Sequence, residues 1–303
     1  MRLRAIVNQS GGTLAAIGGD CGEAATRIRS AFEQAGAEAD VRLVAPAQLA
    51  DAFAEAAKAP GLDAVVAGGG DGTISCAAGA LAGGGRPLGI LPLGTLNHLA
   101  RDAGIPAELD AAAATIVQGR RRRIDLAEVN GHVFVNNSAV GLYPDMVRFR
   151  DIQQGRSKRA AMLSASLRAL RAFRRHRLWI SAPGLEAPIR TPLLFVGNNR
   201  YQVNLLALGQ RAALDRGELC LYAVRARSRA HLVWAGLRGL FGKLDQQRDF
   251  ITAYVTEAEI AADRPALTLS ADGETLTMKT PLRYRILPGA LELIVPEEQA
   301  PAG

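Results

Sequence analysis

The stretch Leu62–Thr73, LDAVVAGGGDGT, carries the residues with the clearest chemical potential. Its apolar run Ala64–Ala67 predicts a buried strand that ends directly in a glycine-rich turn. Consecutive glycines let the backbone approach an anion and direct N–H groups at it, and the next helix starts there with its positive end. Asp71 adds a carboxylate that suits a phosphate-bound Mg²⁺. Together these residues indicate a nucleotide-phosphate site.

A second block, Leu91–Pro106, reads LPLGTLNHLARDAGIP and places Gly94 before an expected helix Leu96–Ala103. The Thr95 hydroxyl and the Asn97 amide suit a phosphate or a ribose. An ordinary helix start with Thr95 as N-cap explains the same residues equally well. Taken alone, this block leaves both interpretations open.

The third block, Ala271–Glu274, is an Asp-Gly turn between two expected strands. Most such turns are structural hairpins. The chemical alternative is that Asp272 and Glu274, two acids flanking one glycine, take the proton of a substrate hydroxyl during phosphoryl transfer. That alternative requires Asp272 to act at the phosphate site of the glycine-rich turn.

The first 118 residues alternate strands with helices, which predicts a parallel sheet with helices on both faces. The expected strands are Leu3–Val7, Ala39–Val44, Ala64–Ala67 and Gly89–Leu91, and the expected helices are Glu23–Ala35, Gln48–Lys58, Ile74–Leu81, Leu96–Ala103 and Leu109–Val117. Such sheets bind ligands at the carboxyl ends of their strands. The glycine-rich loops after Val7, Ala67 and Leu91 all fall at such ends.

From Ile124 onward, strands of alternating polarity predominate. Asn130–Gly131 predicts a type I′ turn between the strands Ile124–Val129 and His132–Asn136. Further expected elements are strands at Leu178–Ser181, Pro192–Gly197, Glu218–Val224, Thr252–Val255, Ala266–Ser270, Glu274–Met278, Leu282–Ile286 and Leu291–Ile294, and helical inserts at Ser157–His176 and Arg229–Lys243. We place the boundary in a basic linker, Arg120–Arg123. This gives domains 1–123 and 124–287, and the tail 288–303 is a candidate to return to the first.

The composition is that of a folded chain, with 49% hydrophobic residues among 303, enough for two domains with a core each. No apolar run reaches the roughly 20 residues that cross a bilayer, and the N-terminus predicts a strand rather than a signal peptide. Cys21, Cys76 and Cys220 lack metal-ligand spacing and predict reduced thiols in a cytoplasmic protein. The oligomeric state stays open, a homodimer included.

Positive charge is concentrated in the second part of the chain. Residues 1–119 hold 8 basic and 12 acidic side chains, and residues 120–303 hold 28 and 17, within a net charge of +7. A basic surface suits an anionic membrane or a nucleic acid, although an arginine-rich genome would give the same net charge. Nucleic acid is disfavoured because few aromatic residues accompany the arginines.

Segment 148–177 holds ten basic residues and one acid, with leucines at helical spacing. A basic amphipathic helix can lie on anionic lipid. Packing of its apolar stripe on its own domain is the commoner arrangement. Both interpretations stay open for this segment.

In this order, GGGDGT after a strand, PLGTLNHLARDAGIP and the late ADGE resemble the diacylglycerol kinase catalytic-domain family of bacterial lipid kinases and of sphingosine and ceramide kinases. The resemblance runs nearly end to end, through Ile124–Gly141, Leu214–Leu219 and Pro281–Pro296. It implies an ATP-dependent lipid kinase in phospholipid metabolism. It also implies a Rossmann-like α/β N-terminal domain, similar to NAD kinases and phosphofructokinases, a β-rich, sandwich-like C-terminal domain, and an active site between them.

The resemblance also implies roles for individual residues. The nucleotide-phosphate loop would be Gly69, Gly70, Asp71, Gly72 and Thr73, and the nucleotide side would be lined by Asn8, Thr95 and Asn97. Asp272 would be the general base on the lipid hydroxyl, with Glu274 beside it. The implied cofactors are ATP and Mg²⁺, the latter near Asp71. The implied substrate is a membrane lipid resembling diacylglycerol, used in the cytoplasm or at the inner face of the membrane.

Three departures from the family pattern leave alternatives. The first loop, Asn8–Gly12, lacks the usual proline, and Asn97–His98 replaces a common Asn-Asp pair. Arg216 stands where many members place an aspartate that holds a structural Mg²⁺, leaving Asp215 and Glu218 as its neighbours. NAD kinase shares the glycine turn but uses an Asn-Glu pair in the second block. A non-catalytic lipid-binding protein on a kinase scaffold fits the changed first loop and Arg216.

Overall fold

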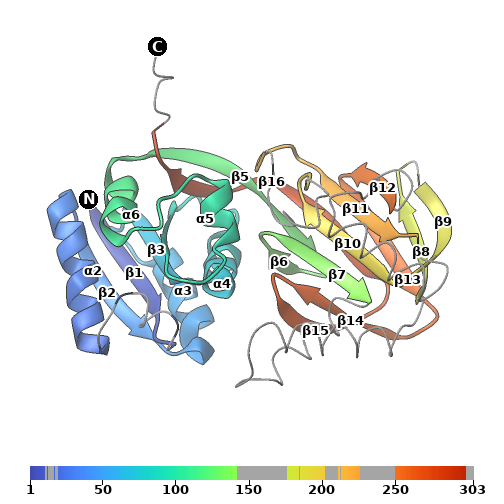
Figure 1. Ribbon diagram of the computed structural model, residues 1–303, viewed down its shortest axis with the longest axis horizontal. Coiled ribbons are helices and arrows are strands. Elements are labelled where there is room, and N and C mark those ends of the chain that lie inside the picture. The colour runs from blue at the N-terminus through green and yellow to red at the C-terminus, as the bar shows by residue number, and fades with distance from the viewer. Residues whose placement is uncertain are drawn as a thin grey trace, which may run out of the picture. The chain divides into compact units, whose positions relative to one another are not determined.

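The computed structural model describes residues 1–10, 12, 17, 20–141, 176–183, 185–201, 211, 213–225 and 250–297. The chain divides into two compact units, the first comprising Met1–Leu126 with Pro288–Gly303 and the second comprising Ala127–Leu287 (Figure 1). The expected helix Arg229–Lys243 lies outside the described residues. So does segment 148–177 up to the start of strand β8. No helix in the described ranges is long and apolar enough to cross a membrane.

Unit 1 is a parallel sheet with its helices in the connections. Its elements are β1 (Arg2–Asn8), α2 (Cys21–Ala35), β2 (Glu38–Val44), the 3₁₀ turn Pro46–Gln48, α3 (Leu49–Lys58), β3 (Ala64–Gly69), α4 (Asp71–Leu81), β4 (Leu88–Pro92), α5 (His98–Asp102), α6 (Leu109–Gln118), the first part of β5 (Arg120–Val129) and the last part of β16 (Leu282–Val295). The strand order is β2-β1-β3-β4-β16, and all four pairings are parallel.

The hydrophobic pattern explains this arrangement. All six residues of β3 are buried, as in the middle of a parallel sheet that is covered on both faces. Right-handed crossovers place α2 on one face and α3 and α4 on the other. In agreement, α2 packs beside α6, and α3 packs beside α4 (Figure 1). The Asp20 side chain caps the start of α2, and Gly36 ends it in the left-handed conformation.

Two expectations for unit 1 were wrong. Arg120–Arg123 is not a linker but the beginning of strand β5. β5 pairs with β16, and Arg121 and Arg123 form ion pairs with Glu292 of β16. The expected helix Leu96–Ala103 begins only at His98, with Asn97 rather than Thr95 as its N-cap. The backbone of Asn97 is left-handed, with φ of 48°, and the helix therefore cannot extend further back.

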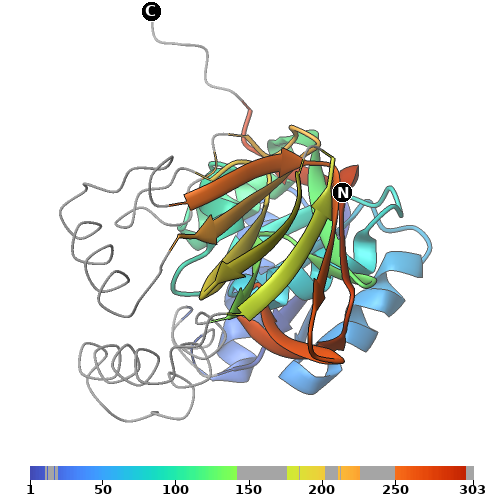
Figure 2. The same cartoon turned by 90° about the vertical axis from the view of Figure 1, so that its right-hand side faces the viewer.

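Unit 2 is an all-antiparallel β structure. Its remaining strands are β6 (His132–Phe134), β7 (Asn137–Gly141), β8 (His176–Ala182), β9 (Leu185–Thr191), β10 (Leu193–Asn198), β11 (Leu219–Val224), β12 (Phe250–Val255), β13 (Glu257–Ala262), β14 (Ala266–Ala271) and β15 (Glu274–Lys279). One sheet has the order β12-β11-β10-β7-β14-β15, and β16, β13, β8 and β9 pair in sequence in the other (Figure 2). The α/β unit followed by this unit confirms the predicted fold class.

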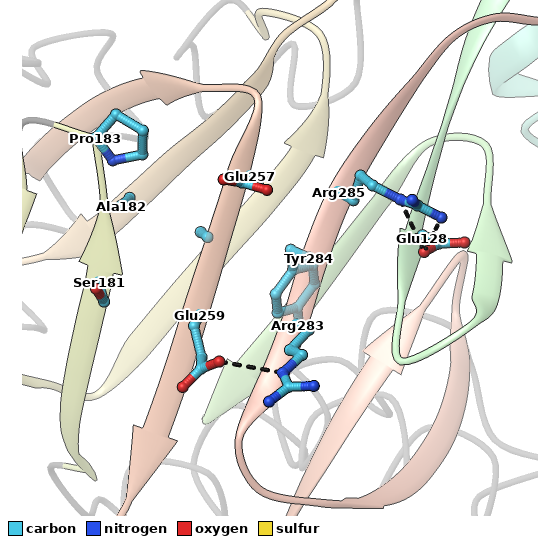
Figure 3. A pocket seen from close by; sticks show the side chains of 10 residues that line it. Glu128, Ser181, Ala182, Pro183, Glu257, Glu259, Arg283, Tyr284 and Arg285 are labelled. Carbon is cyan, nitrogen blue, oxygen red and sulfur yellow. Dashed lines mark hydrogen bonds and ion pairs between the residues drawn. The ribbon is translucent and has the colours of Figure 1, made fainter.

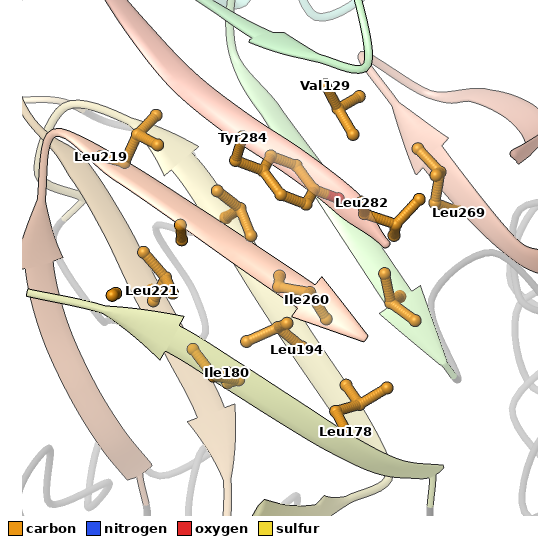
Figure 4. Packing of buried hydrophobic residues seen from close by; sticks show 14 of the residues in the cluster. Val129, Leu178, Ile180, Leu194, Leu219, Leu221, Ile260, Leu269, Leu282 and Tyr284 are labelled. Carbon is orange, nitrogen blue, oxygen red and sulfur yellow. The ribbon is translucent and has the colours of Figure 1, made fainter. Parts of the chain in front are cut away.

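Side chains from both sheets form the core of unit 2 (Figure 4). Leu194, Leu221 and Leu269 come from the six-stranded sheet, and Ile260 and Tyr284 come from the other. The expected type I′ turn is confirmed, because Asn130 and Gly131 have φ of 48° and 83°.

The sequence missed β7, β9 and β13 and divided β16 in two. In β13 the buried positions alternate with Glu257 and Glu259 but include alanine, which gives a weak apolar signal. β9 is the last strand in its sheet and contains a proline, which is typical of edge strands. The two expected strands Leu282–Ile286 and Leu291–Ile294 lie on either side of Pro288–Gly289. The strand continues because Asp125 accepts the Gly289 N–H at 2.9 Å.

A second, aromatic cluster in unit 2 surrounds a buried thiol. Tyr201, Cys220 and Tyr222 are buried together, with Phe195 and Phe250 packed against them. The rings of Phe195 and Tyr201 meet edge to face with centroids 5.2 Å apart. Burial raises the pKa of the Cys220 thiol to about 11, because the thiolate would lose its hydration there.

We expect the free energy of unfolding to fall between pH 9 and pH 11. In the unfolded chain the Cys220 thiol ionises near 9, whereas in the folded protein it keeps its proton to about 11. The stabilisation is therefore fully present below pH 9 and is lost as the pH rises through 11, by about 2–3 kcal/mol in total. Urea unfolding of the wild type and Cys220→Ala across this range tests the expectation. If the free energy of unfolding changed equally with pH in the two proteins, the expectation would be contradicted.

Candidate active site

Three loops of unit 1 meet at one edge of its sheet. They follow β1, β3 and β4, which are neighbours in the strand order. The register aligns Val7 with Gly68 and Gly69 with Pro92, so the three strands end at the same level. This is the edge at which parallel α/β sheets bind ligands.

The first and second loops are joined through Asn8, the last residue of β1. Its Nδ2 donates to the Thr73 hydroxyl at 3.1 Å, and its Oδ1 accepts from the Ser10 N–H at 3.0 Å. Thr73 is buried in the first turn of α4. The loop that lacks the family's proline is thus held by the Asn8 amide.

The second and third loops are joined through Asp71, the first residue of α4. Its Oδ1 accepts the backbone N–H of His98, at the start of α5, at 2.7 Å. The Leu93 N–H also donates to the Gly69 carbonyl at 3.1 Å. The Asp71 carboxylate, which the sequence assigned only to chemistry, therefore also caps a neighbouring helix.

Asn97 organises the third loop from inside. Its Oδ1 accepts from the Gly94 N–H at 3.0 Å, and its Nδ2 donates to the carbonyls of Pro92 at 3.0 Å and of Gly94 at 2.9 Å. The amide thus bonds to its own loop with both ends, and Thr95 and Leu96 are the exposed residues of that loop. The geometry makes Asn97 a residue that shapes the loop.

Asn97→Ala is expected to destabilise unit 1 by about 2–3 kcal/mol, because it removes these three hydrogen bonds and places alanine in a left-handed conformation. Asn97→Gly keeps the backbone conformation and is expected to lose roughly 1 kcal/mol less. Chemical denaturation of the two variants beside the wild type measures the difference. Equal stabilities of all three proteins would contradict the role given to the amide.

The glycines of the second and third loops let two backbones touch. A Cβ on Gly94 would stand 2.4 Å from the Cα of Gly70, and one on Gly69 would stand 2.5 Å from the Thr73 hydroxyl oxygen. Neither distance is possible for real atoms without displacement of the loops. Gly94 is therefore required by contact between the two loops, and Gly69 by contact with Thr73 of its own loop, in addition to any approach of a ligand.

The assembled loops offer donors suited to phosphate. Helix α4 is 11 residues long and begins at Asp71, with Gly70 as its N-cap and no side-chain cap. The amides of its first turn, including Gly72, carry the positive end of the helix dipole. The sequence has no GxxxxGK[ST] motif, so backbone amides rather than a P-loop lysine would hold the phosphates.

In unit 2, Asp272 is fixed at the β14–β15 turn. Its Oδ2 accepts the Val135 N–H at 2.7 Å, and its Oδ1 accepts those of Asn136 at 2.8 Å and Asn137 at 3.1 Å. The residue has φ of 46°, the left-handed conformation that a tight Asp-Gly turn needs. Glu274 is exposed at the start of β15. The turn is therefore a structural hairpin, as one of the two interpretations of the sequence predicted. It also holds the Asp272 carboxylate in a fixed position.

Comparison with known proteins covers both units. The diacylglycerol kinase catalytic domain family matches residues 2–129, and the YegS C-terminal NAD kinase beta sandwich-like domain family matches residues 145–295. A protein of Pseudomonas fluorescens named "Probable lipid kinase YegS-like" is 33% identical over 278 residues, which cover 89% of this chain and 91% of that one. The chain belongs to the diacylglycerol kinase family. The family predicted from the sequence is thus confirmed, and so is the enzyme class, a lipid kinase.

Further relatives agree with this assignment. A protein of the same name from Pectobacterium atrosepticum is 33% identical over 78% of this chain and 79% of its own. A crystal structure of a Bacillus anthracis protein has a TM-score of 0.74 at 22% identity, covering 100% of this chain and 98% of that one. A second, of a diacylglycerol kinase from the same organism, has a TM-score of 0.69 at 19% identity. At these identities the two structures support the fold.

The predicted metal residues Asp215 and Glu218 of this diacylglycerol kinase family member lie just before β11. Both carboxylate oxygens of Glu218 accept from the guanidinium of Arg200, which also raises the pKa of that guanidinium. Asp215 lies exposed, four residues before β11 begins at Leu219. Glu218 is thus paired with a cation of the chain itself, and Asp215 and Glu218 as ligands of a structural Mg²⁺ stay a prediction. Within the described ranges, no group of three or more His, Cys, Asp and Glu side chains could hold a metal ion.

Sequence reasoning missed several buried polar residues in this diacylglycerol kinase family member. Asp125 of β5 is buried and accepts the Gly289 N–H; its signal was an acid inside the apolar run Ile124–Val129. Buried Asn136 and Asn198 belong to two Asn-Asn pairs at strand ends in unit 2. Repeated amides at such positions indicate a polar network, and they were overlooked.

Unit 2 also has an open groove of about 940 Å³ over β8, β13 and β16 (Figure 3). Arg285 meets Glu128 there at 2.9 Å, and Arg283 meets Glu259 at 3.1 Å. None of the sequence-predicted site residues lines it. Since both arginines are paired with carboxylates of the groove itself, it is not assigned to the kinase site.

Proposed function

We propose that the protein transfers the γ-phosphoryl group of ATP to the hydroxyl of a membrane lipid resembling diacylglycerol. The observation that carries the proposal is the joined set of three loops at the carboxyl ends of β1, β3 and β4. Asp71 and the start of α4 lie within that set, in a chain of the lipid-kinase family. ATP is the donor that a kinase of this family uses, and the start of α4 supplies the amides for its phosphates.

Each unit has its own part in the proposed reaction. The amides of Gly69–Thr73 bind the phosphates. Asp71 provides a carboxylate oxygen of the kind Mg²⁺ prefers, and the ion when bound would neutralise charge on the phosphates. Asp272 takes the proton of the lipid hydroxyl as that oxygen bonds to the γ-phosphorus and the bond to ADP breaks. The exposed carboxylate of Glu274 lies two residues away and adds negative charge beside the base.

The test is a phosphorylation assay with the purified protein, Mg²⁺ and γ-labelled ATP. Separate reactions contain micelles with diacylglycerol, a sphingoid base or ceramide, and one contains NAD. Label in a chloroform-soluble product that EDTA abolishes is the expected result. Label in NADP would instead indicate an NAD kinase, and no label in any reaction would favour a non-catalytic lipid-binding protein.

We propose that the protein contacts the membrane through its positively charged segment 148–177. Segment 148–177 has ten basic residues and one acid, and basic segments bind anionic membrane surfaces in a salt-dependent way. We therefore expect the protein to sediment with vesicles that contain phosphatidylglycerol at low salt and to be released at high salt. Equal binding to neutral vesicles would contradict a charge-based contact at the inner face of the membrane.

A further inference from the structure

The three amides that hold Asp272 belong to a short segment that runs from the end of β6 to the first residue of β7. Val135, Asn136 and Asn137 each donate a backbone N–H to its carboxylate. The Asp272 N–H donates back to the Asn137 carbonyl at 2.9 Å. The position of the carboxylate is thus set by the orientation of these peptide groups.

The carbonyls of the same segment are held by buried side chains. The Val135 carbonyl accepts from Arg211 Nη1 at 2.7 Å and from Asn198 Nδ2 at 2.8 Å. The Asn136 carbonyl accepts from the Tyr201 hydroxyl at 2.8 Å. Two peptide groups are therefore held from both sides, the one between Val135 and Asn136 and the one between Asn136 and Asn137. In each, the carbonyl oxygen accepts from a buried side chain and the N–H donates to Asp272.

Arg211 differs from the other two donors in charge and geometry. The residue is 7% exposed, and its Nη2 also donates to the Asn136 Oδ1 at 3.1 Å. The two terminal nitrogens of the guanidinium thus contact the backbone carbonyl of Val135 and the side chain of Asn136. A planar guanidinium can form this fork and an ammonium cannot. The backbones of Arg211 and Tyr201 form a bridge, which fixes the base of the side chain.

We propose that Arg211 is a positioning residue for Asp272, acting through the peptide between Val135 and Asn136. That peptide has a cation at its oxygen and a carboxylate at its N–H. Hydrogen bonds to ionised groups are stronger than neutral ones, and such chains reinforce one another at low dielectric. Arg211 therefore sets the plane of the peptide, and the peptide sets the carboxylate. For catalysis the proposal rests on the proposed kinase function, but the positioning itself does not.

Amide hydrogen exchange tests the positioning without any activity. In Arg211→Met, peptides that contain Val135–Asn137 are expected to exchange at least about 10-fold faster than in the wild type, while β11 keeps its protection. Arg211→Lys, which restores one donor, is expected to lie between the two. The matched control is Arg285→Met, which removes another arginine of unit 2, one whose ion pair among the described residues is with Glu128 in the groove.

Wild-type exchange at Val135–Asn137 in Arg211→Met, with or without a loss of stability, would overturn the proposal. So would faster exchange across the whole of unit 2 in Arg211→Lys, the milder variant, because Arg211 would then stabilise the unit generally. Equal acceleration at this segment in Arg285→Met would also overturn it.

Kinetics extend the test to catalysis. Arg211→Met is expected to lower kcat by about 10–100-fold with the KM for ATP within about 2-fold of the wild type, because the nucleotide is bound elsewhere. Arg211→Lys should recover part of kcat. An unchanged kcat, or an effect on the KM for ATP alone, would overturn the link to catalysis. A wild type that phosphorylates no lipid would overturn the proposed function, and the exchange result would still decide the positioning.

Discussion

Gly94→Ala is expected to lower kcat/KM for ATP by about 100-fold or more, the loss that a displacement near 1 Å can cause at a reacting site. The added Cβ would stand 2.4 Å from the Gly70 Cα and 2.7 Å from the Asn97 Oδ1. The first neighbour is a backbone atom, and the second is a side-chain oxygen of an amide that three hydrogen bonds hold in place. The second loop must therefore move away from the third, and the Asn97 amide must leave the Gly94 N–H.

The displacement reaches the phosphate-binding elements directly. Gly70 is the N-cap of α4, and Asp71 bonds to the start of α5 at His98. Separating the loops therefore reorients the first amides of α4 and breaks the link through Asp71. Both changes weaken the binding of phosphates, and we expect KM for ATP to rise and kcat to fall.

The matched control is Gly84→Ala in the α4–β4 connection of the same unit. There the added Cβ would meet its nearest atom, the Leu81 carbonyl oxygen, at an ordinary 3.4 Å. ATP binding, measured by calorimetry with a non-hydrolysable analogue, and steady-state kinetics should be unchanged in this control. If Gly94→Ala binds ATP as tightly as Gly84→Ala does, the loops of unit 1 do not form the nucleotide site.

Local signals in the sequence predicted the framework of unit 1 well. The apolar run before GGGDGT predicted β3, which the structure extends to Gly69. A buried parallel strand is a continuous apolar run, and a glycine turn marks its end without long-range information. The three loops could be placed at one edge for the same reason, because parallel strands that alternate with helices end at the same side.

The hydrogen bonds that join the loops could not be predicted. The Asn8 amide bonds to Thr73 and the Asp71 carboxylate to His98, over separations of 65 and 27 residues. The resemblance placed Asn97 on the nucleotide side, but nothing in the sequence indicated that its left-handed backbone directs the amide toward Pro92 and Gly94. Side-chain direction depends on backbone conformation, which a single sequence does not give at a turn.

In unit 2 the ADGE turn was recognisable as a hairpin, but its partners were not. The amides of Val135–Asn137 lie about 135 residues from Asp272 in the chain. Arg211 could not be linked to the turn either, because its Nη1 donates to the Val135 carbonyl, on the side of the peptide away from the N–H that Asp272 accepts. The sequence thus identified the carboxylate, and the structure identified what holds it.

Asp272→Asn is expected to lower kcat for lipid phosphorylation by about 1,000-fold, within the range attributed to a general base. The amide has no basic oxygen to accept the hydroxyl proton. It also replaces one of the carboxylate oxygens by an NH₂ group, which would face a backbone N–H of Val135 or Asn136. We therefore expect a loss of stability of about 1–3 kcal/mol in unit 2 as well.

The two effects can be separated by temperature and by a matched control. Kinetics are measured well below the unfolding midpoint of each variant, so that the folded fraction is close to one. The control is Asp263→Asn, a change at an exposed turn between β13 and β14 of the same unit, which should leave both kcat and stability near wild-type values. A loss of kcat that disappears once the Asp272→Asn protein is fully folded would make Asp272 a structural residue only. A loss that persists in the folded protein, with KM for ATP unchanged, requires the carboxylate itself, since the amide variant keeps the turn but cannot take the proton.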